Sequence, residues 1–290
     1  MIRPEEMSGA TRGILLMLLV TLLAAMMNVV ARHVAATVNP YMIVFFRLLF
    51  GLLFLLPFFL RQGISVFKTK RLGGHMTRAG LNVANMVFFF TAVGITPLAE
   101  LVALTFTAPV FATVLSVLLL RELVGKHRWA AILLGFAGAM VIVRPGFQAL
   151  SEGHMHSLLS ALSWACVMLT VKSLSRTESS LTIVAYMAVL MTPIALVPAL
   201  FFWQTPTLQE LGWLAIMGAI GTAVHFLLAQ AVREADLSVV MPFDFTKLIW
   251  ISLLGFLVFG EVPAWTTWTG GVLIFASGTY IAHRETLKRN

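Results

Sequence analysis

The chain has 290 residues, of which 59% are apolar and only 11% charged, and its mean hydropathy is +0.93. An ordinary soluble domain has roughly 45–50% apolar and about 25% charged residues, so this composition excludes that class and indicates a surface in contact with lipid. The net charge of +8 does not indicate nucleic-acid binding, because Lys and Arg lie in short runs between apolar blocks.

Ten apolar blocks follow one another along the chain, and each suits a helix that crosses about 30 Å of hydrocarbon with about 20 residues. We place them at 13–36, 41–60, 79–95, 98–120, 128–144, 155–175, 181–203, 210–231, 237–259 and 265–283. The blocks lack the alternation of apolar and polar residues that is typical of membrane strands. The sequence therefore predicts an all-α integral membrane protein with ten transmembrane helices.

The loops between the blocks predict the direction of the helices, because Lys and Arg stay preferentially on the cytoplasmic side of a membrane. With the amino terminus inside, the predicted inner segments hold 16 of the 20 Lys and Arg residues. The predicted outer segments hold Arg32 and Arg144, and the spans contain Arg47 and Lys247. We expect both termini to be cytoplasmic.

The second half of the chain repeats the first at an offset of 139 residues. This offset aligns Phe106 with Phe245, Thr107 with Thr246, Glu122 with Glu261 and Trp129 with Trp268. We predict two five-helix repeats, 1–150 and 151–290. Because five is odd, the second repeat enters the membrane from the opposite side, and such inverted repeats are typical of secondary transporters with alternating access.

One segment has a distinctive arrangement of Pro, Glu, Trp and Gly. It reads APVFATVLSVLLLRELVGKHRWAAILLGFAGAMVIV from Ala108, and contains Pro109, Glu122 and Trp129. With this segment the chain resembles the EamA-type branch of the drug/metabolite transporter superfamily over nearly its whole length. The second copy departs from the pattern, since Lys247 and Leu248 replace the usual acidic residue or Ala, and the Pro. The resemblance implies a multi-pass transporter of the bacterial inner membrane.

Polar residues inside the spans are the candidates for solute binding, because a charge at the centre of a span costs about 2.5–3.5 kcal/mol and usually faces a cavity. Asp244 and Lys247 lie one helical turn apart near the predicted midplane, where they either bind the solute or neutralise each other. The predicted substrate-binding residues are Asn28, Arg47, Asn82, Asn85, Trp164, His225, Asp244 and Lys247.

Each candidate also has a structural interpretation. Arg47 could bond helix-end carbonyls, and the Asn and His side chains could join helices to one another. Trp164 could be a packing residue. Glu100 fits the positive end of a helix or a coupling role. His154 and His156, two residues apart, do not share a helical face, so we expect no metal site.

We expect a secondary carrier, because no phosphate-binding loop of the Gly-x-x-x-x-Gly-Lys-Ser/Thr type occurs. Export of amino acids or related small zwitterions or cations is the first hypothesis. Organic cations, drugs or nucleotide-like metabolites are alternatives, and an intramembrane enzyme or a channel is a more distant one. We expect no cofactor and no catalytic residue. The expected partners are a small solute and membrane lipid, with no nucleic acid, and the expected state is a monomer or weak dimer.

Overall fold

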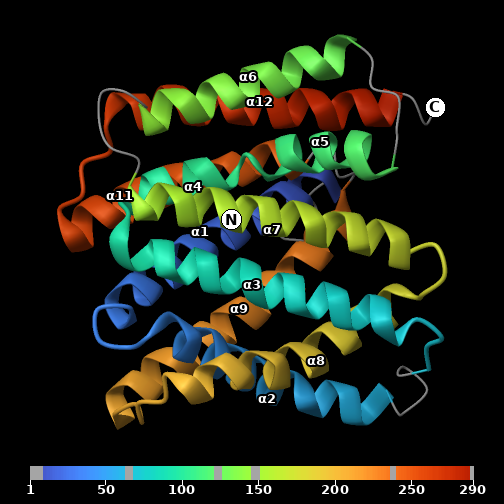
Figure 1. The fold of residues 1–290 in the computed structure, drawn as a ribbon, viewed down its shortest axis with the longest axis vertical. Coiled ribbons are helices and arrows are strands. Elements are labelled where there is room, and N and C mark those ends of the chain that lie inside the picture. The colour runs from blue at the N-terminus through green and yellow to red at the C-terminus, as the bar shows by residue number, and fades with distance from the viewer. Residues whose placement is uncertain (1–8, 63–67, 121–125, 145–150, 236–239, 288–290) are drawn as a thin grey trace.

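The computed structural model describes residues 9–62, 68–120, 126–144, 151–235 and 240–287, and the described residues form helices and no strands. The first half contains α1 (Gly9–Val34), α2 (Pro40–Gln62), α3 (Leu72–Ile95), α4 (Leu98–Thr105), α5 (Ala108–Leu120) and α6 (Lys126–Val143). The second half contains α7 (Glu152–Leu174), α8 (Ser180–Phe201), α9 (Leu208–Glu234), the 3-10 helix η3 (Met241–Phe245), α11 (Thr246–Phe259) and α12 (Trp265–Leu287). The predicted all-α class is confirmed, and most helices run side by side across the molecule (Figure 1).

Seven helical segments of the described chain are long and apolar enough to cross a membrane. They comprise α1, α2, α3, α4 with α5, α7, α8 and α9. The other three predicted spans coincide with α6, with η3 and α11, and with α12. The ten-span count and the direction of the termini therefore remain predictions.

Two of the predicted spans are interrupted rather than continuous. The span predicted at 98–120 ends its first helix at Thr105 and resumes at Ala108, where Pro109 has no N–H to continue the hydrogen-bond ladder. The span predicted at 237–259 begins as η3 and becomes α-helical at Thr246. Phe106 and Phe245, which mark these two junctions, are partners in the 139-residue repeat. Both halves are therefore interrupted at the same repeat position.

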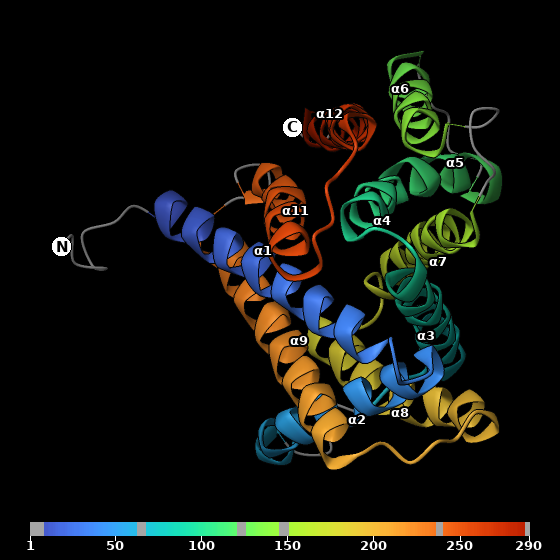
Figure 2. The same ribbon diagram turned by 90° about the vertical axis from the view of Figure 1, so that its left-hand side faces the viewer.

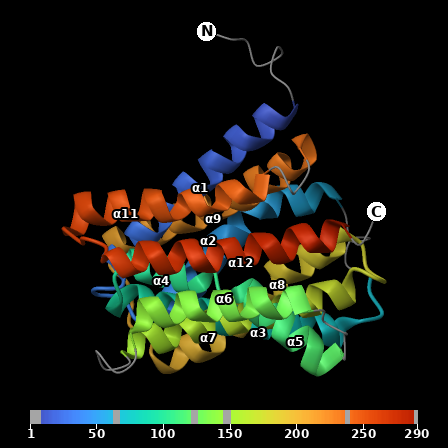
Figure 3. The ribbon, with the colours of Figure 1, turned by 90° about the horizontal axis from the view of Figure 1, so that it is seen from above.

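The packing of the helices follows the predicted repeat, in which α1, α2 and α3 correspond to α7, α8 and α9. α3 packs along α7 and α9 along α1, and α3 also packs on α8 as α9 packs on α2. α6 packs along α12, at one side of the bundle (Figures 1 and 3). When the two halves are exchanged, the contact of α3 with α7 becomes that of α9 with α1, and the contact of α3 with α8 becomes that of α9 with α2. The contact of α6 with α12 is unchanged by the exchange.

α6 and α12 approach each other closely through two glycines. A Cβ added at Gly138 would lie 2.7 Å from the carbonyl oxygen of Gly270, so the two backbones leave no room for a side chain. Small residues allow this kind of close helix packing in membranes. Gly138 and Gly270 therefore allow α6 and α12 to pack closely.

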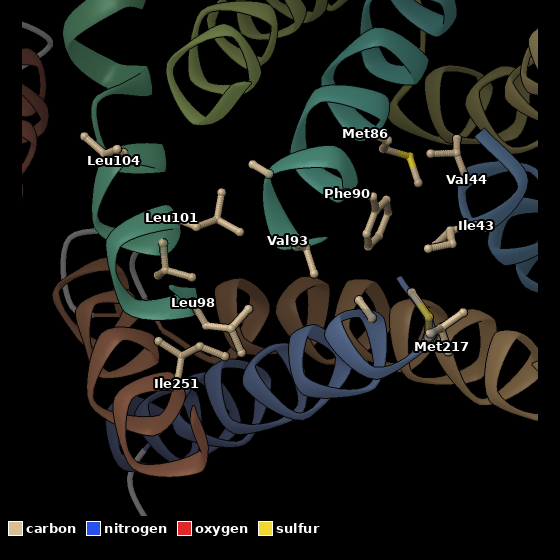
Figure 4. Close-up of a cluster of buried hydrophobic side chains, with 14 of the residues drawn as sticks. Ile43, Val44, Met86, Phe90, Val93, Leu98, Leu101, Leu104, Met217 and Ile251 are labelled. Carbon is tan, nitrogen blue, oxygen red and sulfur yellow. The ribbon is translucent and has the colours of Figure 1, made fainter. Parts of the chain in front are cut away.

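The core lies between the two halves. Leu98, Leu101 and Leu104 of α4 are fully buried, and Ile251 of α11 packs against them (Figure 4). The same cluster continues through Phe90 of α3 towards α2 and α9. Large apolar side chains also cover the outside of the helices, as a lipid-facing surface requires.

Candidate functional site

The two interrupted helices meet at their junctions, and aromatic rings lie there. The Phe106 and Phe245 ring centroids are 5.9 Å apart, and the Phe275 ring of α12 lies 4.6 Å from Phe245. The hydroxyl of Thr246 lies 2.8 Å from that of Thr21 on α1. Interrupted membrane helices are common at the solute sites of transporters, because their ends expose backbone polar groups near the midplane.

Lys247 and Asp244 lie at this junction. The Lys247 Nζ atom is 3.9 Å from a carboxylate oxygen of Asp244 and 4.9 Å from the centre of the Phe106 ring. The side chains remain 22% and 29% exposed, respectively. The pair is therefore partly neutralised and still accessible, which fits both interpretations made from the sequence. Lys247 also has the cation–π contact that the sequence did not reveal.

Arg47 lies on α2 between α3 and α9. Its Nη1 atom is 3.6 Å from the sulfur of Met86, and its guanidinium carbon is 5.8 Å from the centre of the Phe90 ring. Its Nε is buried and has no hydrogen-bond partner in the part of the chain that the structure describes. The guanidinium also lies against Gly221, where an added Cβ would be 2.9 Å from Nη2. Arg47 is thus held in place by contacts that are weak for a charged group.

The three predicted asparagines differ in their surroundings. Asn82 of α3 is buried and donates to the sulfur of Met191 on α8 at 3.4 Å. Asn85 accepts a 2.8 Å bond from the Ser160 hydroxyl of α7, which favours a role in joining these helices. Asn28 of α1 is buried, and its side-chain oxygen has no hydrogen-bond partner among the described residues.

His225 and Trp164, the two remaining candidates, are both exposed. His225 of α9 lies within electrostatic range of Arg47 and of Arg78. Trp164 lies on α7 and is 40% exposed. The structure thus brings His225 and Arg47 into one neighbourhood. The sequence interpretation missed Arg78, which was counted among the cations of a cytoplasmic loop.

Arg78 is in fact a buried residue of α3. It donates to the backbone oxygen of Ile183 at 3.1 Å and to the sulfur of Met187 at 3.4 Å, and both acceptors belong to α8. Its spacing of four residues from Asn82 places both on one face of α3. This spacing is the sequence signal that could have identified it.

A cluster of paired charges lies at the end of the bundle where α1, α3 and α11 end, which is the predicted outer end. This end of the ribbon faces the viewer in Figure 2. Arg32 lies 3.1 Å from Glu261 and donates to the backbone oxygens of Val93 and Thr96, the latter at 2.9 Å. The second oxygen of Glu261 accepts from the Leu98 N–H at 2.8 Å. These bonds join α1 and the segment after α11 to α3 and α4.

The local backbone explains the position of Glu261. Gly260 ends α11 with a φ of +69°, a left-handed conformation that glycine adopts readily. The Gly260 and Glu261 N–H groups bond back to Phe256 and Gly255, which turns the carboxylate towards α4. Its repeat partner, Glu122, lies outside the described residues. The repeat was therefore the sequence signal for Glu261.

His154 and Glu100 form a second pair at the same end. The His154 Nε2 atom lies 3.1 Å from a carboxylate oxygen of Glu100, and the imidazole is almost fully buried. The pair joins α7 to α4. The sequence interpretation considered each residue separately and missed the contact, because 54 residues separate them.

Comparison with known proteins shows the relationships of the chain. The EamA-like transporter family model matches residues 11–144 and again 152–282. A riboflavin transporter of Vibrio cholerae is 36% identical over 96% of this chain and 95% of its own, and one of Rhizobium johnstonii is 33% identical over 97% and 94%. An S-adenosylmethionine uptake transporter of Rickettsia bellii is 27% identical over 89% of each chain. One solved crystal structure covers 97% of this chain and 99% of its own with a TM-score of 0.61, and its 15% identity shows the fold alone.

The family resemblance seen in the sequence is therefore confirmed, and the relatives are transporters rather than enzymes. The apolar helices and the bacterial relatives indicate a multi-pass protein of the bacterial inner membrane. The family model matches nearly the whole chain, once in each half. This chain therefore belongs to the EamA-like transporter family and transports small molecules.

Proposed function

We propose that this protein binds a planar aromatic metabolite of the flavin type where its two interrupted helices meet, and carries it across the membrane by alternating access. The observation on which this depends is the junction itself. There, Phe106, Phe245 and Phe275 lie beside the partly exposed pair of Lys247 and Asp244.

The chemistry of this junction suits such a metabolite. An isoalloxazine ring offers two faces for stacking and carbonyl oxygens at one end, and phenyl rings and an ammonium group complement these features. Stacking on an aromatic side chain contributes about 1–3 kcal/mol for a nucleic-acid base, and a flavin ring is larger. The relatives named as riboflavin transporters support this class of solute.

Alternating access requires two related halves that exchange conformations. We take repeats 1–150 and 151–290 as the halves, inverted with respect to each other, with ten spans and both termini in the cytoplasm. The interhelical contacts that interchange between halves support this assignment. At the predicted outer end Arg32 and Glu261 join α1 and α11 to α3 and α4.

The bonds found among the described residues of the opposite end join different helices. Arg71 donates to the Ser173 backbone oxygen of α7 at 2.8 Å, and Arg12 of α1 lies 3.8 Å from Glu234 of α9. Together with the bond from Arg78 to α8 described above, these bonds join α3 to α7 and α8, and α1 to α9. This difference supports a state that is closed at the outer end and can separate at the cytoplasmic end.

A counterflow assay with purified protein in liposomes tests the proposal. We expect the wild type to exchange labelled riboflavin with saturation, and Phe245→Ala to weaken the apparent affinity about 10-fold, as loss of one stacking contact predicts. Phe256→Ala is the matched control, because Phe256 is an exposed residue of α11, the helix that follows directly after Phe245. Equal affinity in both variants would contradict the assigned junction, and absence of flavin exchange by the wild type would contradict the solute class.

A second candidate is the amino-acid export expected from the sequence. Lys247 and Asp244 would supply one charge for each end of a zwitterion, and their 3.9 Å separation favours this possibility. Competition separates the two candidates. Unlabelled amino acids should leave riboflavin exchange unchanged if the aromatic ring is the recognised group, and should themselves show counterflow if the zwitterion is.

A further inference from the structure

A second polar region lies on α2, α3, α8 and α9, and it is basic. It contains Arg47, Arg78, Asn82 and His225, and His225 lies within electrostatic range of both arginines. The sequences of α2, α3 and α8 contain no Asp or Glu. The acidic residues of α9 lie near its two ends, where Glu210 accepts bonds from Thr37 and Thr207 and Glu234 faces Arg12.

The donors of this region are bonded largely to weak acceptors. Arg47, Arg78 and Asn82 donate to the sulfurs of Met86, Met187 and Met191, respectively. A thioether accepts hydrogen bonds poorly, and a buried charged donor gains much more from a carbonyl, carboxylate or phosphate oxygen. Arg78 already has such an acceptor in the backbone oxygen of Ile183. Among the described residues, Arg47 donates only to the sulfur, and its buried Nε has no hydrogen-bond partner.

The Arg47 side chain occupies space that is free because residue 221 is a glycine. A Cβ at Gly221 would lie 2.9 Å from Nη2 and 3.3 Å from the guanidinium carbon, closer than ordinary van der Waals contact. One turn earlier, a Cβ at Gly218 would lie 3.1 Å from the Arg47 backbone oxygen. The two glycines form a recess in α9 that admits α2 and its guanidinium. The centre of the Phe90 ring lies 5.8 Å from the guanidinium carbon.

We propose that Arg47 binds an oxygen of the transported molecule that has partial or full negative charge, and that Gly221 is the positioning residue for this contact. The inference rests on the proposed transport function and specifies one end of the solute. A ring carbonyl and a phosphate or carboxylate group are the two sources of such an oxygen. A solute with net positive charge is disfavoured, because no described acidic side chain offsets the guanidinium here.

Equilibrium binding to detergent-purified protein provides the main test, with riboflavin, lumiflavin and flavin mononucleotide as probes of fluorescence quenching. Arg47→Gln should weaken binding about 10-fold or more for each probe that carries the recognised oxygen, since it removes a charge-assisted hydrogen bond. Arg47→Lys should restore part of the loss. If the oxygen is a ring carbonyl, Arg47→Gln should weaken the binding of lumiflavin, which lacks the ribityl chain, as much as it weakens the binding of riboflavin. If it is a phosphate, flavin mononucleotide should bind the wild type more tightly than riboflavin does, and only that advantage should disappear.

Gly221→Ala tests the positioning role without altering the charge. It should weaken binding of the same probe about 3- to 10-fold, whereas Gly212→Ala on the same helix should have no effect, because nothing lies within 4 Å of a Cβ there. Thermal unfolding and size-exclusion profiles identify variants that fail to fold. Unchanged dissociation constants in folded Arg47→Gln would overturn the proposal.

A second measurement separates this inference from the flavin assignment. Thermal stabilisation of the wild type by adenosine monophosphate, adenosine and S-adenosylmethionine compares anionic, neutral and cationic probes that share one ring. The anionic probe should stabilise most, and Arg47→Gln should abolish this order. That result supports the inference even if the wild type binds no flavin. Greater stabilisation by the cationic probe would overturn the inference, as would an order of stabilisation that Arg47→Gln preserves. So would a wild type that is stabilised by none of these probes and also binds no flavin.

Discussion

Two regions of this transporter treat buried charge in opposite ways. At the predicted outer end Arg32 has a carboxylate and two backbone oxygens, and His154 has Glu100. Around Arg47, in the middle of the bundle, a guanidinium has a thioether and an aromatic ring. Paired charges hold helices together, whereas a charge without a strong partner is available to a ligand. The predictions below test whether this difference separates closure from binding.

The largest effect is expected from reversing one charge of the outer cluster. Arg32→Glu places two carboxylates where 3.1 Å now separates opposite charges, and it removes the bonds to Val93 and Thr96. Counterflow should fall at least about 10-fold, as loss of a partly buried ion pair predicts. The double variant Arg32→Glu with Glu261→Arg should recover part of the activity. If the double variant is no better than the single one, the pair does not act as a unit.

A smaller effect is expected at the second pair of this end. Replacing His154 by Phe keeps an aromatic ring but leaves Glu100 without its 3.1 Å partner. The free energy of unfolding should fall by about 1–3 kcal/mol, the cost of an unsatisfied buried group. Thermal unfolding of the single variants His154→Phe and Glu100→Gln and of the double variant measures the coupling. Additive losses would show that the two side chains act independently.

The junction pair should contribute little to stability, because both side chains are partly exposed. Lys247→Met removes the 3.9 Å contact with Asp244 and the cation over Phe106, and should lower the unfolding free energy by about 1 kcal/mol or less. Solute affinity should change more than stability does. A large fall in melting temperature without any change in affinity would show that this pair stabilises the fold and does not bind the solute.

The smallest effect is expected at the predicted cytoplasmic end. Arg12 and Glu234 are 3.8 Å apart with side chains 40% and 37% exposed, and pairs of this kind contribute about 0–1 kcal/mol. Arg12→Ala should leave both the melting temperature and counterflow close to wild type. A marked loss of transport would show that this end also needs its charges paired, and would weaken the contrast between the regions.

Much of the fold could be predicted from hydropathy, because apolar blocks and loop cations are properties of the sequence itself. The interruption at Phe106 was not expected, although Pro109 signals it, because hydropathy is high on both sides of it. Candidate residues inside spans were found from their charge or polarity. Pairs such as Arg32 with Glu261 could not be found, since 228 intervening residues separate their positions in the chain. Arg78 was missed because a cation near a span end looks like a loop residue until its burial is known.

Under the proposed alternating access, the matching interruptions have a consequence for the balance between the two states. If both halves had one sequence, exchanging their conformations would produce a state of equal energy. The bias must then come from positions where the repeat partners differ. At the junctions Ala108 and Pro109 of one half correspond to Lys247 and Leu248 of the other. Exchanging these dipeptides between the halves should shift the resting population and leave the route through the protein intact.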